Sequence, residues 1–401
     1  MQKHQAGAQG QIAFYNECLK KAKAVYLRLF PKEGEKKPKW AMFCADKARS
    51  MVDRPHKRLQ DAWFLEMQGK LLANKRAMVF LTPETDIVTG GIMSICNLAS
   101  RSQGMKELHG CEVLLATLPG RHTISKYTRF ENDWRIFRFE QIEGILGELE
   151  ELFLQIPEVC VCPFLSWLET RPDLLGKVPA RRLNILNQNV ELMPGTKEVK
   201  ALAGYFSYVT QTCAHTRYCT EAARELYGMP VHLLPADIPG RFYQIPYGEK
   251  ENLIAYSDDE NPYKEKTLEE LKKRLPDYRF LMIQNMTYEE YRQTISRAKW
   301  TLTFGEGWDA YYLQPYASNS IGFTVFNEAF CPEYMRKIPT VFPDYETLPQ
   351  QMAEFIRTFD REDLYSAKIG EIRGMLFPPP PPDVVPRDAL LEFYKGNYTF
   401  P

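Results

Sequence analysis

The residues best suited to chemistry lie within residues 301–327, where an apolar run ends at Phe304 and is followed by Gly305, Glu306 and Gly307. Ligands of a parallel sheet bind at the carboxyl ends of its strands, so an acid between two glycines at such an end is expected to face a cleft. The glycines let the backbone approach a ligand closely, and the following helix N-terminus offers N–H groups to a diphosphate. A carboxylate repels phosphate, so Glu306 suits sugar or ribose hydroxyls. The alternative is an acid in a surface turn.

Three consecutive amides form a second candidate site. Asn187, Gln188 and Asn189 end a strand-like apolar run. An amide both donates to and accepts from hydroxyl groups. We therefore predict that these side chains contact a sugar acceptor, with an ordinary polar turn as the alternative.

The elements that must position these residues alternate along the chain. Short apolar runs at residues 77–81, 111–116, 159–163, 183–186, 205–210 and 231–234 predict strands, and amphipathic segments between them predict helices. After a break at residues 245–248 the alternation restarts, with strands predicted at 253–256, 278–283, 300–304 and 322–326. Two such series predict an α/β protein with two Rossmann-like, doubly wound domains facing each other across a cleft.

These patterns divide the chain into four parts. Residues 1–74 are predicted to form an N-terminal helical extension, 75–247 an N-terminal Rossmann-like domain, and 248–360 a C-terminal Rossmann-like domain. Residues 361–401 form a Pro-rich tail, whose five consecutive prolines favour an extended polyproline II strand.

The stretch around Glu306 resembles a known family. The family is that of retaining glycosyltransferases of the GT-B fold, those of the large family four. Their motif is a glutamate, seven residues and a second glutamate, and it begins at the end of a strand. A helix of small residues and another strand follow it. Glu306 occupies the first position and Gln314 the second. The next helix and strand are matched by Pro315, Ala317, Ser318 and residues 322–326. The resemblance covers most of the C-terminal domain and, in outline, the N-terminal domain.

The resemblance implies a role for each matching residue of the donor site. Glu306 looks like the acid that contacts the hydroxyls of the donor sugar beside the reacting carbon. Gln314 looks like the residue that grips the nucleotide ribose, although the family usually has a carboxylate there. An amide oxygen still accepts from a hydroxyl, more weakly than a charged acceptor does.

The family also uses an arginine and a lysine early in the C-terminal domain to stabilise the departing diphosphate. The matching loop, residues 257–266, contains no arginine, so Lys264 is the catalytic candidate, with Lys266 behind it in donor binding. A solvated lysine at a helix start is the alternative. Gly90 and Gly91 resemble the glycine loop that lies against the donor phosphates or the acceptor, with a plain tight turn as the alternative.

Composition limits the other classes of function. Lys plus Arg and Asp plus Glu are equal, at 51 each, which argues against a general affinity for nucleic acid. Nine cysteines without CxxC spacing favour free thiols in a reducing cytoplasm, and Cys160 and Cys162 are predicted within a strand. We expect no cofactor. Asp258 and Asp259 offer two adjacent carboxylates that a metal ion could use, but the GT-B fold that the sequence resembles generally transfers sugar without metal, so we expect no metal site.

The sequence lacks an apolar stretch of the roughly 18 to 20 residues that span a bilayer, and it lacks a signal sequence. Residues 11–30 nevertheless favour peripheral contact with an anionic membrane. An apolar helix stripe lies beside basic residues there: Ile12, Tyr15, Leu19, Ala22, Tyr26 and Leu29 beside Lys20, Lys21, Lys23 and Arg28. Packing onto the protein's own core is the alternative. We expect a cytoplasmic protein, at the inner face of the membrane if this contact forms.

The sequence thus predicts a glycosyltransferase that moves a sugar from a nucleotide-diphosphate donor to a glycan or glycolipid acceptor, in bacterial surface polysaccharide synthesis. Two alternatives stay open: a catalytically inert sugar-binding or scaffolding homologue, and a nucleotide-sugar epimerase of the same fold.

Overall fold

The computed structural model describes residues 39–235, 242–377 and 388–398, and side chains from residue 53 onward. Its first sheet has seven strands in the order β3-β2-β1-β4-β5-β6-β7, and all its pairings are parallel. The strands are β1 (Arg76–Thr82), β2 (Glu112–Thr117), β3 (Ile136–Arg138), β4 (Glu151–Pro157), β5 (Ala180–Asn187), β6 (Tyr208–Cys213) and β7 (Val231–Leu233). The chain order reverses between β1 and β4, so the topological switch point lies between these two strands.

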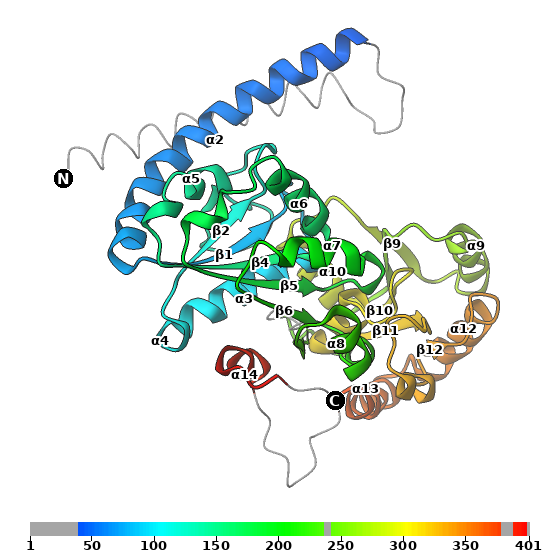
Figure 1. Cartoon of the computed structure of the whole chain (residues 1–401). Coiled ribbons are helices and arrows are strands. Elements are labelled where there is room, and N and C mark those ends of the chain that lie inside the picture. Colours follow the sequence, from blue (N-terminus) through cyan, green and yellow to red (C-terminus); the bar gives the residue numbers. More distant parts are fainter. Residues whose placement is uncertain (1–38, 236–241, 378–387, 399–401) are drawn as a thin grey trace.

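The second sheet has five parallel strands in the order β12-β11-β10-β8-β9. They are β8 (Glu251–Ser257), β9 (Arg279–Ile283), β10 (Ala298–Leu302), β11 (Ile321–Val325) and β12 (Val341–Phe342). Here the switch point lies between β8 and β10. Both strand orders are those of doubly wound folds, which confirms the predicted pair of Rossmann-like domains (Figure 1).

Helices cover both sheets. Those associated with the first sheet are α2 (Lys39–Asn74), α3 (Gly90–Gly104), α4 (Lys106–His109), α5 (Phe139–Glu143), α6 (Val161–Glu169), α7 (Thr196–Ala203) and α8 (Glu221–Tyr227). The rest are α9 (Lys264–Arg274), α10 (Tyr288–Arg297), α11 (Ala310–Leu313), α12 (Leu348–Phe359), α13 (Glu362–Leu376) and α14 (Ala389–Lys395). Helix α2 confirms the helical extension for residues 39–74. The amphipathic stripe of residues 11–30 lies outside the described residues.

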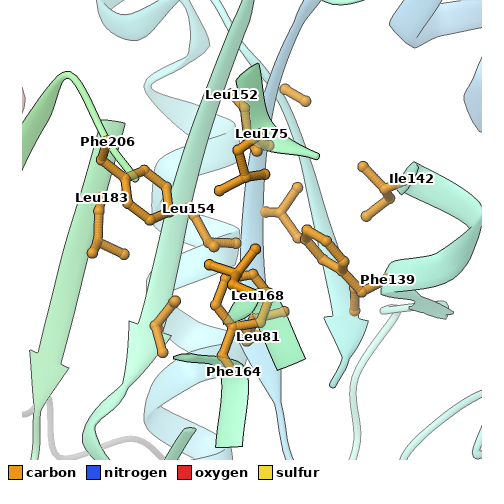
Figure 2. Packing of buried hydrophobic residues seen from close by; sticks show 14 of the residues in the cluster. Leu81, Phe139, Ile142, Leu152, Leu154, Phe164, Leu168, Leu175, Leu183 and Phe206 are labelled. Carbon is orange, nitrogen blue, oxygen red and sulfur yellow. The ribbon is translucent and has the colours of Figure 1, made fainter. Parts of the chain in front are cut away.

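Alternate residues of the first sheet enter different cores. Val79 and Leu81 of β1 pack on one face, and Met78 and Phe80 on the other, because successive strand side chains point in opposite directions. Figure 2 shows the first of these cores, in which leucines of β1, β4 and β5 meet aromatic residues such as Phe164 of α6. A sheet buried on both faces holds its strand ends in fixed positions.

The second core continues into the C-terminal domain. Leu253 of β8, Ile283 of β9 and Tyr288 of α10 belong to the same buried cluster as Phe80. The backbone N–H of Tyr288 also donates to the carbonyl of Arg129 at 2.9 Å. The two sheets are therefore joined by apolar packing as well as by the chain.

The C-terminal helix α14 packs against the N-terminal domain, on the side of the first sheet opposite α2 (Figure 1). Phe393 is 2% exposed and stacks on Phe153 of β4, with ring centroids 6.4 Å apart. Asp388 pairs with Arg101 of α3 at 2.6 Å. The predicted tail thus contains two helices, α13 beside α12 and α14 on the first sheet, while the proline run lies outside the described residues.

One predicted strand is wrong. Residues 159–163 are helical, and the strand precedes them as β4. Pro157 ends β4, and Pro163 sits in the first turn of α6, where its missing N–H leaves no helical bond unmade. Cys160 and Cys162 are therefore helical, with Cys160 buried and Cys162 exposed.

Candidate functional site

The loop after β10 is tied to the end of the neighbouring strand β8, at the switch point of the second sheet. The backbone N–H of Phe304 donates to Ser257 Oγ, the last residue of β8, at 2.9 Å. Asn261, in the loop after β8, donates through Nδ2 to the carbonyl of Phe304 at 3.0 Å. Glu306 therefore lies where the two strand ends meet, as the sequence pattern predicts for a ligand-facing acid.

Gly307 is required by the shape of this loop. Its φ is +85°, a backbone conformation that L side chains rarely adopt, and a Cβ there would lie 2.9 Å from both Val325 O and Cys331 Sγ. At Gly305 a Cβ would lie 2.7 Å from Asp259 Oδ2. The two glycines thus let the loop pack against β11 and the acidic loop after β8.

Asp309 fastens the other side of the loop. It caps helix α11, accepting from the N–H of Tyr312 through Oδ1 at 3.0 Å. Its Oδ2 accepts from Thr303 Oγ1 at 2.7 Å and from the N–H of Gly307 at 3.3 Å. One carboxylate therefore connects the residue after β10, the glycine turn and the start of the helix.

Glu306 reaches the facing domain. Asn189, beyond the end of β5, donates through Nδ2 to Glu306 Oε1 at 2.6 Å. The N–H of Asn189 donates to Glu158 Oε1 at 2.9 Å, and its Oδ1 accepts from the N–H of Glu191 at 2.9 Å. The candidate acid of one domain and a candidate acceptor amide of the other thus form one site.

The site is strongly acidic. Burial, followed by the charges of Asp309, Asp259 and then Glu191 and Glu158, raises the pKa of Glu306 to about 7. Burial also raises the pKa of Asp309 to about 6, against the lowering effect of its hydrogen bonds. The charged groups with the largest effects on Glu306 are all acids, so this carboxyl is partly protonated at neutral pH.

The structure places Lys264 beside the site and Lys266 away from it. Lys264 Nζ donates to the carbonyl of Asp259 at 3.1 Å and lies 4.0 Å from Asp258 Oδ1. It also lies 5.9 Å from the ring centroid of Phe304. Lys266 is exposed on α9.

The other predicted residues divide between the site and the core. Gly90 and Gly91 are the first two residues of α3, and Gly91 lies against Gln188, whose Oε1 would be 3.5 Å from a Cβ at Gly91. Asn187 is 2% exposed and donates to Gln211 Oε1 at 2.9 Å, within the sheet. Gln314 is 3% exposed at the start of the 3₁₀ turn Gln314–Ser318. The amide triplet therefore presents Gln188 and Asn189 near the interdomain site, while Asn187 packs inward.

Sequence reasoning missed Glu158, Glu191 and Asp309. Glu158 directly follows β4 at the switch point of the first sheet, so the misplaced strand boundary concealed it. Asp309 had a usable signal, since an aspartate just before a helix is a favoured N-cap. Glu191 carried no such local signal.

In residues 39–235, 242–377 and 388–398, no three His, Cys, Asp or Glu side chains gather in a way that could hold a metal ion. The helices in the same ranges include none long and apolar enough to cross a membrane.

No family model matches the sequence, and no curated protein matches it. Among solved structures, the chain is similar to an α-glucosyltransferase in complex with UDP-glucose and DNA containing an abasic site, with 10% identity and a TM-score of 0.49 over 75% of this chain and 95% of that one. It is also similar to an α,α-trehalose-phosphate synthase (UDP-forming) from Burkholderia vietnamiensis, with 9% identity and a TM-score of 0.42 over the same shares. These similarities concern the fold, whose assignment rests on the strand orders above.

Proposed function

We propose that this protein is a GT-B glycosyltransferase that moves a sugar from a nucleotide-diphosphate sugar to a hydroxyl of a glycan or glycolipid, with retention. The contact between Glu306 and Asn189 carries the proposal. Glu306 follows β10 at the switch point of one sheet, and Asn189 follows β5 at the carboxyl edge of the other. Ligands bind at these edges in doubly wound domains, so a donor and an acceptor bound there would meet.

In this reaction each side of the site has its own task. Glu306 binds hydroxyls of the donor sugar, while Gln188 and Asn189 orient the acceptor. The bond between the anomeric carbon and the diphosphate oxygen breaks, and the acceptor oxygen bonds to that carbon from the same face. The proton of the acceptor hydroxyl goes to the departing diphosphate, whose charge is stabilised by Lys264 and the backbone N–H groups of the α3 N-terminus.

The acidity of the site favours a second candidate, an inert sugar-binding or scaffolding homologue. Asp258 and Asp259 flank Lys264 and would repel a diphosphate, and the loop supplies no arginine to balance them. A neutral sugar would meet no such repulsion. The third candidate is an epimerase of the same fold, which would rearrange the donor sugar without an acceptor.

We place the activity in bacterial surface polysaccharide synthesis, on the cytoplasmic side of the membrane. This proposal rests on the sequence resemblance and on the basic, amphipathic residues 11–30. Such a stripe would bring the enzyme to a lipid-linked acceptor.

Incubation with a panel of UDP-, GDP-, ADP- and dTDP-sugars, followed by mass spectrometry, separates the three candidates. A glycosyltransferase releases nucleoside diphosphate, by transfer to an added acceptor or slowly to water. An epimerase yields an isomeric nucleotide sugar, and an inert homologue leaves every donor intact.

The same assay tests metal dependence. Release of nucleoside diphosphate that continues in EDTA supports transfer without metal, whereas release that requires added Mg²⁺ or Mn²⁺ contradicts it. An unchanged panel, with sugar binding detected by thermal shift, would replace the proposed transferase with the inert homologue.

A further inference from the structure

We propose that Asp309 is a positioning residue for Glu306: its carboxylate holds the loop that carries this acid, and its charge acts on the Glu306 carboxyl. The inference rests on the proposed role of Glu306 and extends it to a residue that lies outside the matched positions of the sequence motif.

Asp309 is linked by hydrogen bonds to the residues just before and just after Glu306. Thr303 Oγ1 donates to Asp309 Oδ2 at 2.7 Å and also accepts from the N–H of Gly305 at 3.1 Å, so the carboxylate acts on the residue just before Glu306. The N–H of Gly307, just after Glu306, donates to the same oxygen at 3.3 Å. The backbone on both sides of Glu306 is therefore held by hydrogen bonds that converge on Asp309.

The helix start gives the carboxylate a fixed position. Its second oxygen, Oδ1, accepts from the N–H of Tyr312 at 3.0 Å as the N-cap of α11. Tyr312 is 0% exposed, and its phenol interacts with Thr340 at 3.1 Å. Asp309 thus connects a rigid, buried part of the domain to the loop.

The charge of Asp309 acts on the same acid that its hydrogen bonds orient. Burial raises the pKa of Glu306 most, and among the charged groups that raise it further Asp309 has the largest effect, followed by Asp259, Glu191 and Glu158. Because the pKa of Asp309 is about 6, it is already ionised when Glu306 titrates near pH 7. An acid that is half protonated near neutral pH can either donate to or accept from a sugar hydroxyl.

The test compares the full-length protein with D309N and D309S, which remove the charge. Serine is a favoured N-cap, so D309S preserves the cap of α11 if the asparagine variant folds poorly. D344N is the matched control, because Asp344 accepts from the N–H groups of Glu346 and Thr347 before helix α12 but is exposed and outside the site. The titration of Glu306 is followed by NMR in protein labelled with ¹³C at the glutamate carboxyl, and E306Q identifies its signal.

We expect a Glu306 midpoint near pH 7 in the parent protein and a downward shift on the order of one pH unit in D309N and D309S. D344N should leave the midpoint unchanged. A folded D309S with the parent midpoint would overturn the proposal, since a purely structural cap alters the unfolding temperature and leaves the titration in place. The NMR result is independent of turnover, so it stands even if every donor in the panel remains intact.

Discussion

At the residue scale, the proposed chemistry depends on the carboxyl group of Glu306, which belongs to one domain and is hydrogen-bonded to the other. Glu306 accepts a hydrogen bond from Asn189 and is surrounded by other acids.

Replacement of Glu306 by glutamine preserves the size of the side chain but removes its charge and its proton. We expect E306Q to lose on the order of 2 to 4 kcal/mol of transition-state stabilisation, about 30- to 1,000-fold in turnover. Turnover is measured with the donor that the panel identifies, and circular dichroism checks the fold. Parent-like turnover in folded E306Q would exclude the assigned role.

The pKa of Glu306 also makes a prediction for stability. Between about pH 4.5 and pH 7 the folded state holds a proton that the unfolded state has lost, because burial raises the folded pKa from 4.5 to about 7. The contribution of this residue to the free energy of unfolding therefore falls as the pH rises through that range. The free energy of unfolding of E306Q minus that of the parent should therefore be more positive at pH 8 than at pH 5. Urea denaturation at both pH values measures this difference. An equal difference at the two pH values would contradict the raised pKa.

Two lysines on the same helix offer a matched test of donor binding. Lys264 lies beside Asp259 and Phe304, whereas Lys266 is exposed on α9. A charge-assisted contact with phosphate contributes roughly 1.5 to 3 kcal/mol. We expect K264M to weaken the binding of the diphosphate product about tenfold or more in calorimetry, and K266M to change it less than about twofold. Equal effects of the two substitutions would remove Lys264 from the donor site.

At the element scale, the C-terminal helix α14 supports strands of the N-terminal domain. Phe393 of α14 packs against Phe153 of β4, and His232 of β7 interacts through Nε2 with the carbonyl of Ala389 at 2.8 Å. Strands β4 and β7, which belong to the same sheet as the strand that ends at the candidate acceptor amides, are therefore partly stabilised by residues much later in the sequence.

We expect F393A to destabilise the protein by about 3 to 5 kcal/mol, because it removes a buried aromatic side chain and leaves a cavity. Chemical denaturation followed by tryptophan fluorescence measures the change. K395A is the control on the same helix, since the Lys395 side chain is 46% exposed and removing it leaves the apolar face of α14 intact. A similar loss in both variants would mean that α14 is not held by its apolar face.

At the scale of the whole molecule, two sheets with separate switch points bring their carboxyl edges to one site. The apolar cluster that includes Phe80 and Leu253 joins the domains, so the distance between Asn189 and Glu306 depends on this packing as well as on the loops. In the proposed glycosyltransferase, substrates enter between the domains, and we expect the hydrogen bond between these two residues to be exchanged for bonds to a sugar.

The last prediction concerns residues 11–30, whose stripe favours a membrane surface. Each basic residue near an anionic leaflet contributes about 1 kcal/mol, so four of them would hold the protein reversibly. We expect the full chain to sediment with phosphatidylserine-containing liposomes, and a variant lacking residues 1–30 to remain in solution while keeping its fold. Neutral phosphatidylcholine liposomes are the control. Equal sedimentation of both proteins, or unfolding of the shortened one, would make this segment structural.

The sequence by itself determined the features that depend on neighbouring residues. Alternating apolar and amphipathic runs identified most strands and both doubly wound domains, because the period of side-chain burial is a local property of strands and helices. The glycines around Glu306 indicated a loop at a strand end. This signal is also local, because the positive φ at Gly307 limits the residue type at that position.

Only the tertiary structure decided which distant residues share a site. Asn189 and Glu306 are 117 positions apart, and Asn187 packs into the sheet while Asn189 reaches the other domain, although the two amides look alike in sequence. The protonation of Glu306 depends on acids from both domains, and the place of α14 depends on an apolar surface far upstream. These properties arise from the strand order and from the packing of one domain on the other. Both are set by the summed burial of many side chains, which no short pattern contains.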